Sequence, residues 1–270
     1  MVRRPLGNHH HGPDTFLVTS DATSDATSDT TRTDSTAAET ERLRELINGA
    51  RCVLFDFDGP ICRLFAGYSA RNIAQEMVGW LARQGLQGLL TEQERAHPDP
   101  QFVLRTLDER QPDSDLVDAL KDMLTREELK AVPSAWPTPY ADPVIRTWDA
   151  RGARLAVTTN NAADTVHRYL QSRELVDCFA PHIYGRTQEL HQQKPDPYHL
   201  NRALRAMGSD SKSALMIGDT ADDLEAARRA GVPFLGYGST DRKEKLLREA
   251  GAQTVVRSLD SVLRVLREKA

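Results

Sequence analysis

Hydrophobic residues follow two patterns along most of this chain of 270 residues. Short runs of consecutive apolar residues are typical of buried strands, and apolar residues every three or four positions are typical of amphipathic helices. The expected strands cover residues 52–55, 155–157, 183–184, 214–217, 232–235 and 254–256. The expected helices cover residues 142–152 (with Asp142 as N-cap and Pro143 at N1), 162–171, 196–208, 222–230 and a segment from residue 258. This alternation predicts an α/β fold with a mostly parallel sheet and helices on both faces.

One stretch between the first strand and Leu155 breaks the alternation. It shows helical spacing of apolar residues and no convincing strand. The helical patterns in it cover residues 69–83, 99–110 and 115–129. We therefore expect an all-helical insertion over residues 66–135, which interrupts a core made of residues 41–65 and 136–270.

The N-terminal segment has a different composition. Residues 19–40 contain 8 Thr, 4 Ser, 4 Asp and 4 Ala, and no aliphatic residue larger than alanine and no aromatic residue. Such a segment buries too little apolar surface to offset the entropy lost on ordering. We expect residues 1–40 to form a disordered tail.

The charge balance excludes several classes of partner. The net charge is −4, of which the first 40 residues carry −3, so the body is almost neutral. This composition indicates neither a nucleic-acid partner nor an acidic membrane surface, and no apolar run approaches the ~18 residues of a membrane span. The three cysteines are odd in number and form no C-x-x-C motif, which favours a cytoplasmic location.

Four polar groups follow expected strands or precede a helix, where ligands bind in open α/β sheets. They are Asp56-Phe57-Asp58-Gly59, Thr158-Thr159-Asn160, Lys194-Pro195 and Gly218-Asp219 through Asp222-Asp223. Taken singly, most have a structural explanation, such as an Asp-Gly turn, a helix N-cap or a turn with a surface lysine. Clustered carboxylates at a buried strand end, however, are costly without a cation or hydrogen-bond donors.

The order of these groups resembles the haloacid dehalogenase superfamily of aspartate-nucleophile phosphohydrolases, over about Ala50 to Gly236. The matching motifs are Asp56-x-Asp58-Gly59, Thr159, Lys194-Pro195 and Gly218-Asp219-x-x-x-Asp223. The resemblance implies a Rossmann-like core. The helical insertion resembles the C1 cap of the phosphoglycolate phosphatase and β-phosphoglucomutase branch.

The resemblance implies a reaction through an aspartyl-phosphate. Asp56 would attack phosphorus, and Asp58 would protonate the leaving oxygen and then deprotonate the hydrolytic water. Thr159 and Lys194 would hold the phosphoryl oxygens. These four residues are the expected catalytic residues.

The resemblance also implies a Mg²⁺ site, and an all-oxygen ligand set suits that ion. The expected ligands are the Asp56 carboxylate, the Asp58 backbone carbonyl and Asp219, with Asp223 as a further ligand or as the partner of one. Asp222 stands next to Asp223, and the family spacing favours Asp223. Pro60 departs from the family pattern, in which Thr or Val usually follows the glycine.

Substrate contacts beyond the motifs are harder to assign. Thr159 and Lys194 are joined as candidates by Arg63 and Asn160, which flank motifs, and by Tyr68 and Arg71 of the insertion. An exposed arginine or a packed tyrosine is the common alternative for such residues.

Three functions are compatible with these residues. The first is a Mg²⁺-dependent phosphatase that hydrolyses a small phosphorylated metabolite. The second is a phosphosugar mutase that uses the same intermediate. The third is a non-catalytic phospho-acceptor similar to receiver domains, although both acids on the first strand and the insertion count against it. Neither the substrate nor the oligomeric state can be deduced.

Overall fold

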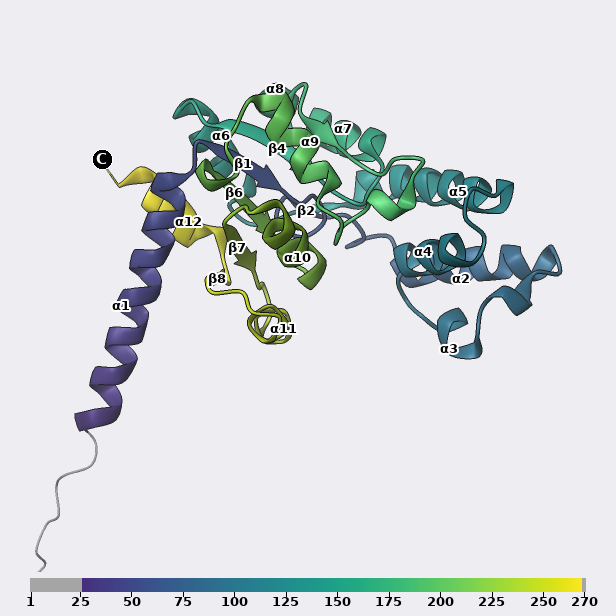
Figure 1. The fold of residues 1–270 in the computed structure, drawn as a ribbon, viewed down its shortest axis with the longest axis horizontal. Helices are drawn as coiled ribbons and strands as arrows, with labels where there is room; N and C mark the ends of the chain where they lie inside the picture. The colour runs from purple at the N-terminus through teal and green to yellow at the C-terminus, as the bar shows by residue number, and fades with distance from the viewer. Residues whose placement is uncertain (1–25, 269–270) are drawn as a thin grey trace, which may run out of the picture. The chain divides into compact units, whose positions relative to one another are not determined.

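A six-stranded parallel sheet is the centre of the fold (Figure 1). The computed structural model describes the backbone of residues 26–268 and the side chains of residues 38–268. The strands, in their spatial order, are β5 (Ile183–Tyr184), β4 (Arg154–Thr158), β1 (Cys52–Phe55), β6 (Ala214–Gly218), β7 (Phe234–Tyr237) and β8 (Val255–Val256). The predicted parallel α/β sheet is confirmed.

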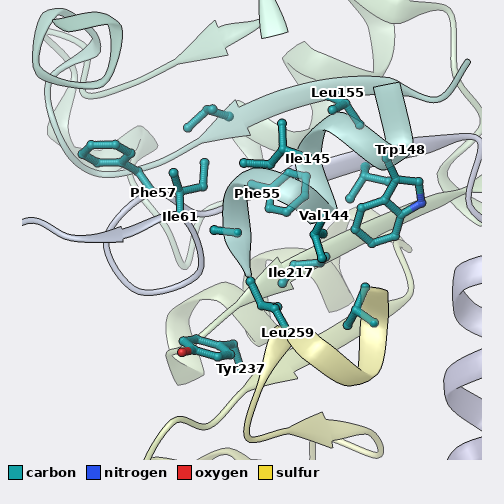
Figure 2. Close-up of a cluster of buried hydrophobic side chains, with 14 of the residues drawn as sticks. Phe55, Phe57, Ile61, Val144, Ile145, Trp148, Leu155, Ile217, Tyr237 and Leu259 are labelled. Atoms are coloured by element: carbon teal, nitrogen blue, oxygen red, sulfur yellow. The ribbon is translucent and has the colours of Figure 1, made fainter. Parts of the chain in front are cut away.

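The middle strand β1 is buried on both faces because all four of its side chains are apolar. Val53 and Phe55 point into one hydrophobic cluster, and Cys52 and Leu54 point into the other. This alternation is the period of two that a strand imposes. In the first cluster, Phe55 packs edge-on against Trp148 with ring centroids 5.8 Å apart (Figure 2).

Helices cover both faces of the sheet, as the pattern of apolar residues predicts. They are α6 (Ala141–Ala150), α7 (Ala163–Ser172), α8 (Val176–Phe179), α9 (Tyr198–Met207), α10 (Ala221–Ala230), α11 (Asp241–Glu249) and α12 (Leu259–Arg267). The side chains of α6, α7 and α12 enter the first cluster, whereas those of α9 and α10 enter the second.

The insertion after β1 is helical, as expected. It contains α2 (Ala70–Arg83), α3 (Glu92–Arg95), α4 (Pro100–Arg110) and α5 (Asp115–Ala131), and α2, α4 and α5 pack against one another (Figure 1). Their buried side chains form a hydrophobic cluster separate from the two clusters of the sheet. The chain enters and leaves this region through an antiparallel pair of short strands, β2 (Cys62–Arg63) and β3 (Trp136–Pro137).

The expected disorder is wrong for part of the N-terminal segment. Helix α1 runs over Ala26–Gly49, so residues 26–40 are helical, while residues 1–25 lie outside the described residues. In the C-terminal part of α1, Leu43 and Ile47 are buried. A helix anchored in this way extends at low cost, because each further residue adds a hydrogen bond without a new nucleation step.

Two further details differ from the expectation. Helix α6 begins at Ala141 after Tyr140, so Asp142 lies in its first turn rather than at the N-cap. Proline is tolerated in that turn because its missing N–H has no helical partner. Helix α11 was not expected, since it is so polar that only Leu247 is buried. Among the described residues, no helix is both long and apolar enough to cross a membrane.

Candidate active site

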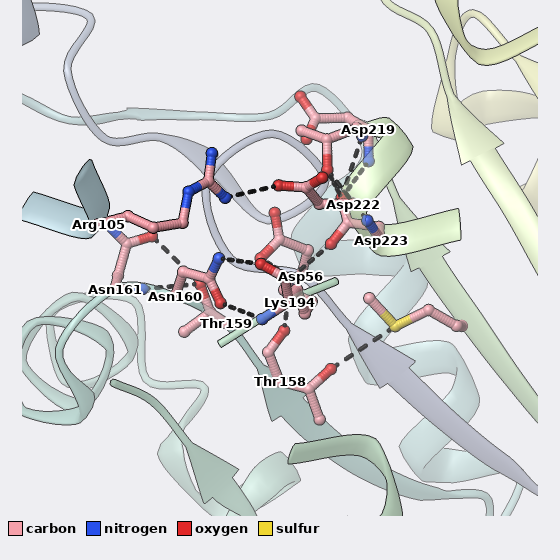
Figure 3. Close-up of polar contacts among 12 residues, drawn as sticks. Asp56, Arg105, Thr158, Thr159, Asn160, Asn161, Lys194, Asp219, Asp222 and Asp223 are labelled. Atoms are coloured by element: carbon pink, nitrogen blue, oxygen red, sulfur yellow. Dashed lines mark hydrogen bonds and ion pairs between the residues drawn. The ribbon is translucent and has the colours of Figure 1, made fainter. Parts of the chain in front are cut away.

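The carboxyl ends of the neighbouring strands β4, β1 and β6 bring the motif residues together (Figure 3). Asp56 follows β1, Thr159 follows β4, and Asp219 follows β6. The loop before α9 contributes Lys194. These residues line a cavity of about 370 Å³ that is bounded on its other side by residues of the helical insertion.

Lys194 lies between two buried carboxylates. Its Nζ donates to Asp56 Oδ1 at 2.7 Å and to the carbonyl oxygen of Thr158 at 3.0 Å, and it also pairs with Asp223 Oδ1. Burial alone lowers the pKa of Lys194, but the carboxylates of Asp223 and Asp56 outweigh burial and raise this pKa. Burial raises the pKa of Asp56, and Lys194 opposes that shift. The lysine is therefore a permanent positive charge beside Asp56.

Three carboxylates form an acidic cluster. Asp56, Asp219 and Asp223 are buried, and one oxygen of each lies within 4.8 Å of the others. Asp223 Oδ2 accepts bonds from the backbone N–H groups of Asp219 and Thr220, at 3.1 and 3.0 Å, and from the Thr220 hydroxyl at 2.6 Å. These donors hold Asp223 in place and leave its other oxygen for Lys194.

Only one oxygen of the Asp219 carboxylate has a partner among the described residues. Its Oδ2 pairs with Lys243 of α11, whereas no described residue donates a hydrogen bond to the buried Oδ1. Burial raises the pKa of Asp219 to about 7, although Lys243 opposes the shift. A buried carboxylate oxygen without a donor is costly, and three clustered oxygens are the donor set that a hard divalent cation prefers. The residues present therefore fit a Mg²⁺ ion.

Two glycines allow the backbone to approach this cluster. A Cβ at Gly59, whose φ is +134°, would lie 2.4 Å from the Asp219 carboxyl group. A Cβ at Gly218 would lie 2.4 Å from the Cβ of Asp223. Only glycine fits at either position, because real Cβ atoms do not come so close to other heavy atoms.

Asp58 has a different environment from Asp56. Its Oδ1 accepts a bond of 2.8 Å from the backbone N–H of Leu64, and its carboxyl group lines the cavity. Burial raises the pKa of Asp58 to about 6, against the lowering effect of the Leu64 N–H. A carboxyl group with such a pKa can both give and take a proton near neutral pH.

The loop after β4 is held by its own side chains. The Thr159 hydroxyl donates to Asn161 Oδ1 at 3.1 Å and accepts from the Asn161 N–H at 3.2 Å. The Asn160 amide bonds the backbone of Lys194 twice, with Oδ1 accepting at 2.9 Å and Nδ2 donating at 3.1 Å. Asn160 lines the cavity, and its side-chain amide holds the backbone of Lys194 in place.

Other candidates lie apart from this group. Arg63 is not one of the described residues that line the cavity, and its guanidinium lies 5.4 Å from the ring centroid of Trp136. Tyr68 donates to Glu127, and Arg71 is exposed. The two neighbouring acids of the fourth motif have different partners. Asp223 belongs to the acidic cluster, whereas Asp222 Oδ2 lies 3.2 Å from NH1 of Arg105 on α4.

Several residues at the site have no sequence signal that marks them. Lys243 lies on the unexpected helix α11, while Gln101 and Arg105 lie on α4 and line the cavity opposite the strand ends. Their spacing is that of ordinary helix residues. Only the tertiary structure shows that these three side chains reach the cavity.

The chain belongs to the haloacid dehalogenase-like hydrolases, whose family profile matches residues 50–231. The expected resemblance is thereby confirmed. The chain is 31% identical to the phosphoglycolate phosphatase of Mesorhizobium japonicum, in an alignment that covers 49% of this chain and only 57% of that protein. It is 28% identical to the phosphoglycolate phosphatase of Agrobacterium fabrum over 70% of this chain and 81% of that protein.

Solved structures share the fold. The crystal structure of CbbY from Rhodobacter sphaeroides in complex with phosphate superposes with a TM-score of 0.57 at 20% identity. The superposition covers 77% of this chain and 94% of that one. At this level of identity, the similarity shows a shared fold.

Proposed function

We propose that the protein is a Mg²⁺-dependent phosphatase that hydrolyses a small phosphorylated metabolite through an aspartyl-phosphate on Asp56. The observation that carries this proposal is the position of Asp56, which touches the charged Lys194 and shares an acidic cluster with Asp219 and Asp223. Phosphoryl transfer needs a nucleophile, neutralisation of charge on the phosphoryl oxygens and a proton donor. Family membership and the phosphoglycolate phosphatase relatives support the same reaction.

The first chemical step is the attack of the Asp56 carboxylate on phosphorus. The bond between phosphorus and the leaving oxygen breaks, and Asp58 in its acid form gives that oxygen a proton. Lys194 opposes the rise that burial causes in the pKa of the nucleophile. When substrate binds, the Lys194 ammonium and the Thr159 hydroxyl, which here donate to protein oxygens, would turn to the phosphoryl oxygens. The second step reverses these roles, since Asp58 takes a proton from the water that attacks the aspartyl-phosphate and releases Asp56.

Asp56, Asp219 and Asp223, with the Asp58 backbone carbonyl, would hold the metal. The ion supplies positive charge to the phosphoryl oxygens when it is bound. The unpartnered Asp219 Oδ1 is the feature of the described residues that fits this assignment best. Lys243 balances part of the charge on Asp219 and lies within the same cavity.

We further propose that residues 66–135 are a cap that selects the substrate. The cavity of about 370 Å³ accommodates a small molecule, and Gln101 and Arg105 of the insertion form part of its lining. Ligand sites of this kind are concave and carry a few convergent polar groups. The core made of residues 41–65 and 136–270 then supplies the chemistry.

Phosphate release from p-nitrophenyl phosphate tests the proposal. We expect steady turnover with Mg²⁺, loss of turnover with EDTA, and a decrease of about 10³-fold or more in Asp56→Asn. Acid-quenched protein should contain an acyl-phosphate that is absent from this variant. Turnover of Asp56→Asn at the wild-type rate would refute the assignment of Asp56 as the nucleophile.

A panel of phosphorylated metabolites then identifies the substrate, and release of free phosphate distinguishes hydrolysis from transfer to a sugar.

A further inference from the structure

A buried ion pair joins the helical insertion to the sheet domain. Glu128 of α5 is 0% exposed and Arg186, in the loop after β5, is 3% exposed. The guanidinium reaches both oxygens of the glutamate, from NH1 at 3.0 Å to Oε1 and from NH2 at 3.2 Å to Oε2. A two-point contact of this type fixes the orientation of the carboxylate.

The same carboxylate accepts bonds from the loop after β4. Glu128 Oε2 accepts from the backbone N–H of Ala162 at 2.9 Å and from the Thr165 hydroxyl at 3.4 Å. Glu128 Oε1 accepts from Asn161 Nδ2 at 3.1 Å. Ala162 is the N-cap of α7, where backbone N–H groups lack partners within the helix. Glu128 of the insertion therefore accepts a hydrogen bond from the N-terminal end of a helix in the sheet domain.

Asn161 links Glu128 to Thr159, the residue proposed to bind the phosphoryl group. With Nδ2 held by Glu128, the Asn161 side chain presents Oδ1 to the Thr159 hydroxyl, which lies 3.1 Å away. The hydroxyl also accepts from the Asn161 backbone N–H. The rotation of the Thr159 side chain is thereby set by a residue that contacts Glu128 (Figure 3 shows Thr159 and Asn161).

A second set of contacts leads to the lysine. The carbonyl oxygen of Asn160 accepts from Gln101 Nε2 at 3.1 Å and from Arg186 NH1 at 3.2 Å. The Asn160 side chain holds both backbone polar groups of Lys194. Gln101 also donates to Glu128 Oε1 at 3.2 Å, so one carboxylate lies at the centre of both sets.

We propose that Glu128 is a positioning residue, which couples the seating of the insertion to the placement of Thr159 and Lys194. Glu128 neither lines the cavity nor belongs to the acidic cluster. It acts directly on Asn161, and through Gln101 and Arg186 on Asn160. This inference rests on the phosphatase function proposed above. The loop takes its binding geometry only when α5 lies against the sheet domain, because the carboxylate that orients the loop belongs to α5.

The neighbouring residue Glu127 offers a matched control. It is buried at 5% exposure on the same helix, and within the described part of the chain it bonds Tyr68 and Lys130 but makes no bond to the loop. We expect Glu128→Gln to lower kcat/KM for p-nitrophenyl phosphate by about 10- to 100-fold, as removal of partners that orient catalytic groups does. Glu127→Gln should stay within about twofold, since the same negative charge is lost from a buried position away from the loop.

Two measurements separate positioning from a loss of folded protein. Inorganic phosphate, tested as a competitive inhibitor in the presence of Mg²⁺, should bind more weakly to Glu128→Gln than to Glu127→Gln by a factor similar to the change in kcat/KM. Both assays are run well below the unfolding midpoint of each variant. Equal kinetics of the two variants, or a lower Tm of Glu128→Gln with unchanged kcat and phosphate affinity, would overturn the proposal.

Asn161→Ala provides a second test that does not depend on the folding of Glu128→Gln. It leaves the Glu128–Arg186 pair and the Ala162 bond in place, and we expect a loss of similar size. The double variant should be no worse than the more damaging single variant, because both act on the same contacts. Wild-type kinetics of Asn161→Ala, or additive losses, would contradict the coupling. Absence of turnover in the wild-type protein would refute the phosphatase function instead.

Discussion

The carboxyl edge of the sheet and the helical insertion line the same cavity with different kinds of charge. At the sheet edge, Asp56, Asp223 and Lys194 are buried in direct contact. On the insertion side, Arg105 pairs with Asp222, and the two side chains are 40% and 45% exposed. Because a buried charge that loses its partner costs far more than an exposed one, the two sides should respond differently to substitution.

On the proposed function, this difference should separate residues that carry the reaction from residues that select the substrate. Changes at the sheet edge should reduce both turnover and stability, whereas changes at Arg105 should alter the preference for substrates and leave the fold intact. Glu128 is the exception, since it belongs to the insertion but is as buried as the acids of the sheet edge. Its substitution should therefore behave like a change in the sheet domain.

Asp58→Asn tests the sheet edge most directly. An amide gives no proton, so we expect hydrolysis of alkyl phosphates to fall by about 10²- to 10⁴-fold. The fall for p-nitrophenyl phosphate should be much smaller, because its leaving group needs little protonation. Steady-state rates for both substrate types check this prediction. Equal losses on both substrates would assign Asp58 a role other than acid catalysis.

Lys194→Met removes the charge between the two carboxylates. We expect turnover to fall by about 10²- to 10³-fold, since an aimed cationic donor is lost from the phosphoryl oxygens. The free energy of unfolding should decrease by about 3–5 kcal/mol, because Asp56 and Asp223 are left buried without their partner. Kinetics and urea unfolding measure the two effects. Lys245→Met, at a residue with a 75% exposed side chain, is the control and should change neither quantity.

The cavity residues of the sheet edge could be deduced from the order of residues, whereas those of the insertion could not. Parallel strands with adjacent carboxyl ends bring Asp56, Thr159 and Asp219 together wherever the intervening chain goes. Gln101 and Arg105, by contrast, reach the cavity only through the packing of α4 on its neighbours. No spacing rule identifies such residues, because every exposed helix position has the same period.

Other features that the sequence did not reveal have equally local causes. The contact of Asn160 with substrate stays a prediction, whereas its bonds to the Lys194 backbone depend on the path of a distant loop. Lys243 lies on a helix whose apolar pattern is too weak to predict. The composition of residues 26–40 indicates that this segment buries little apolar surface. It does not exclude a helix that extends from the buried Leu43.

His199, buried on α9 of the sheet domain, should couple the stability of the protein to pH. Neither of its ring nitrogens has a hydrogen-bond partner among the described residues, and burial, with the nearby charge of Lys194, lowers its pKa to about 4. The unfolded chain, with a pKa of about 6.5, binds a proton that the folded protein excludes. Stability should therefore fall as pH drops from about 6.5 to 4, by about 3 kcal/mol in total.

His199→Phe should remove this share of the pH dependence. The measurement is the free energy of unfolding of both proteins between pH 7 and pH 4, from urea titrations. The difference between the proteins should change by about 3 kcal/mol across this range, with the variant favoured at low pH. Parallel curves for the two proteins would show that His199 does not carry the dependence.

Arg105→Ala should have the smallest effect on the fold and still change the choice of substrate. Its half-exposed pair with Asp222 contributes no more than about 1 kcal/mol, so Tm should change little. Arg105 is the insertion's only cation among the described residues that line the cavity. Substrates with a second anionic group should lose about tenfold in kcat/KM, whereas neutral alkyl phosphates should lose less. Asp222→Asn, which frees the same arginine, should shift this ratio in the opposite direction. A uniform loss over all substrates would place Arg105 with the proposed catalytic residues of the sheet edge and contradict the distinction between the two sides.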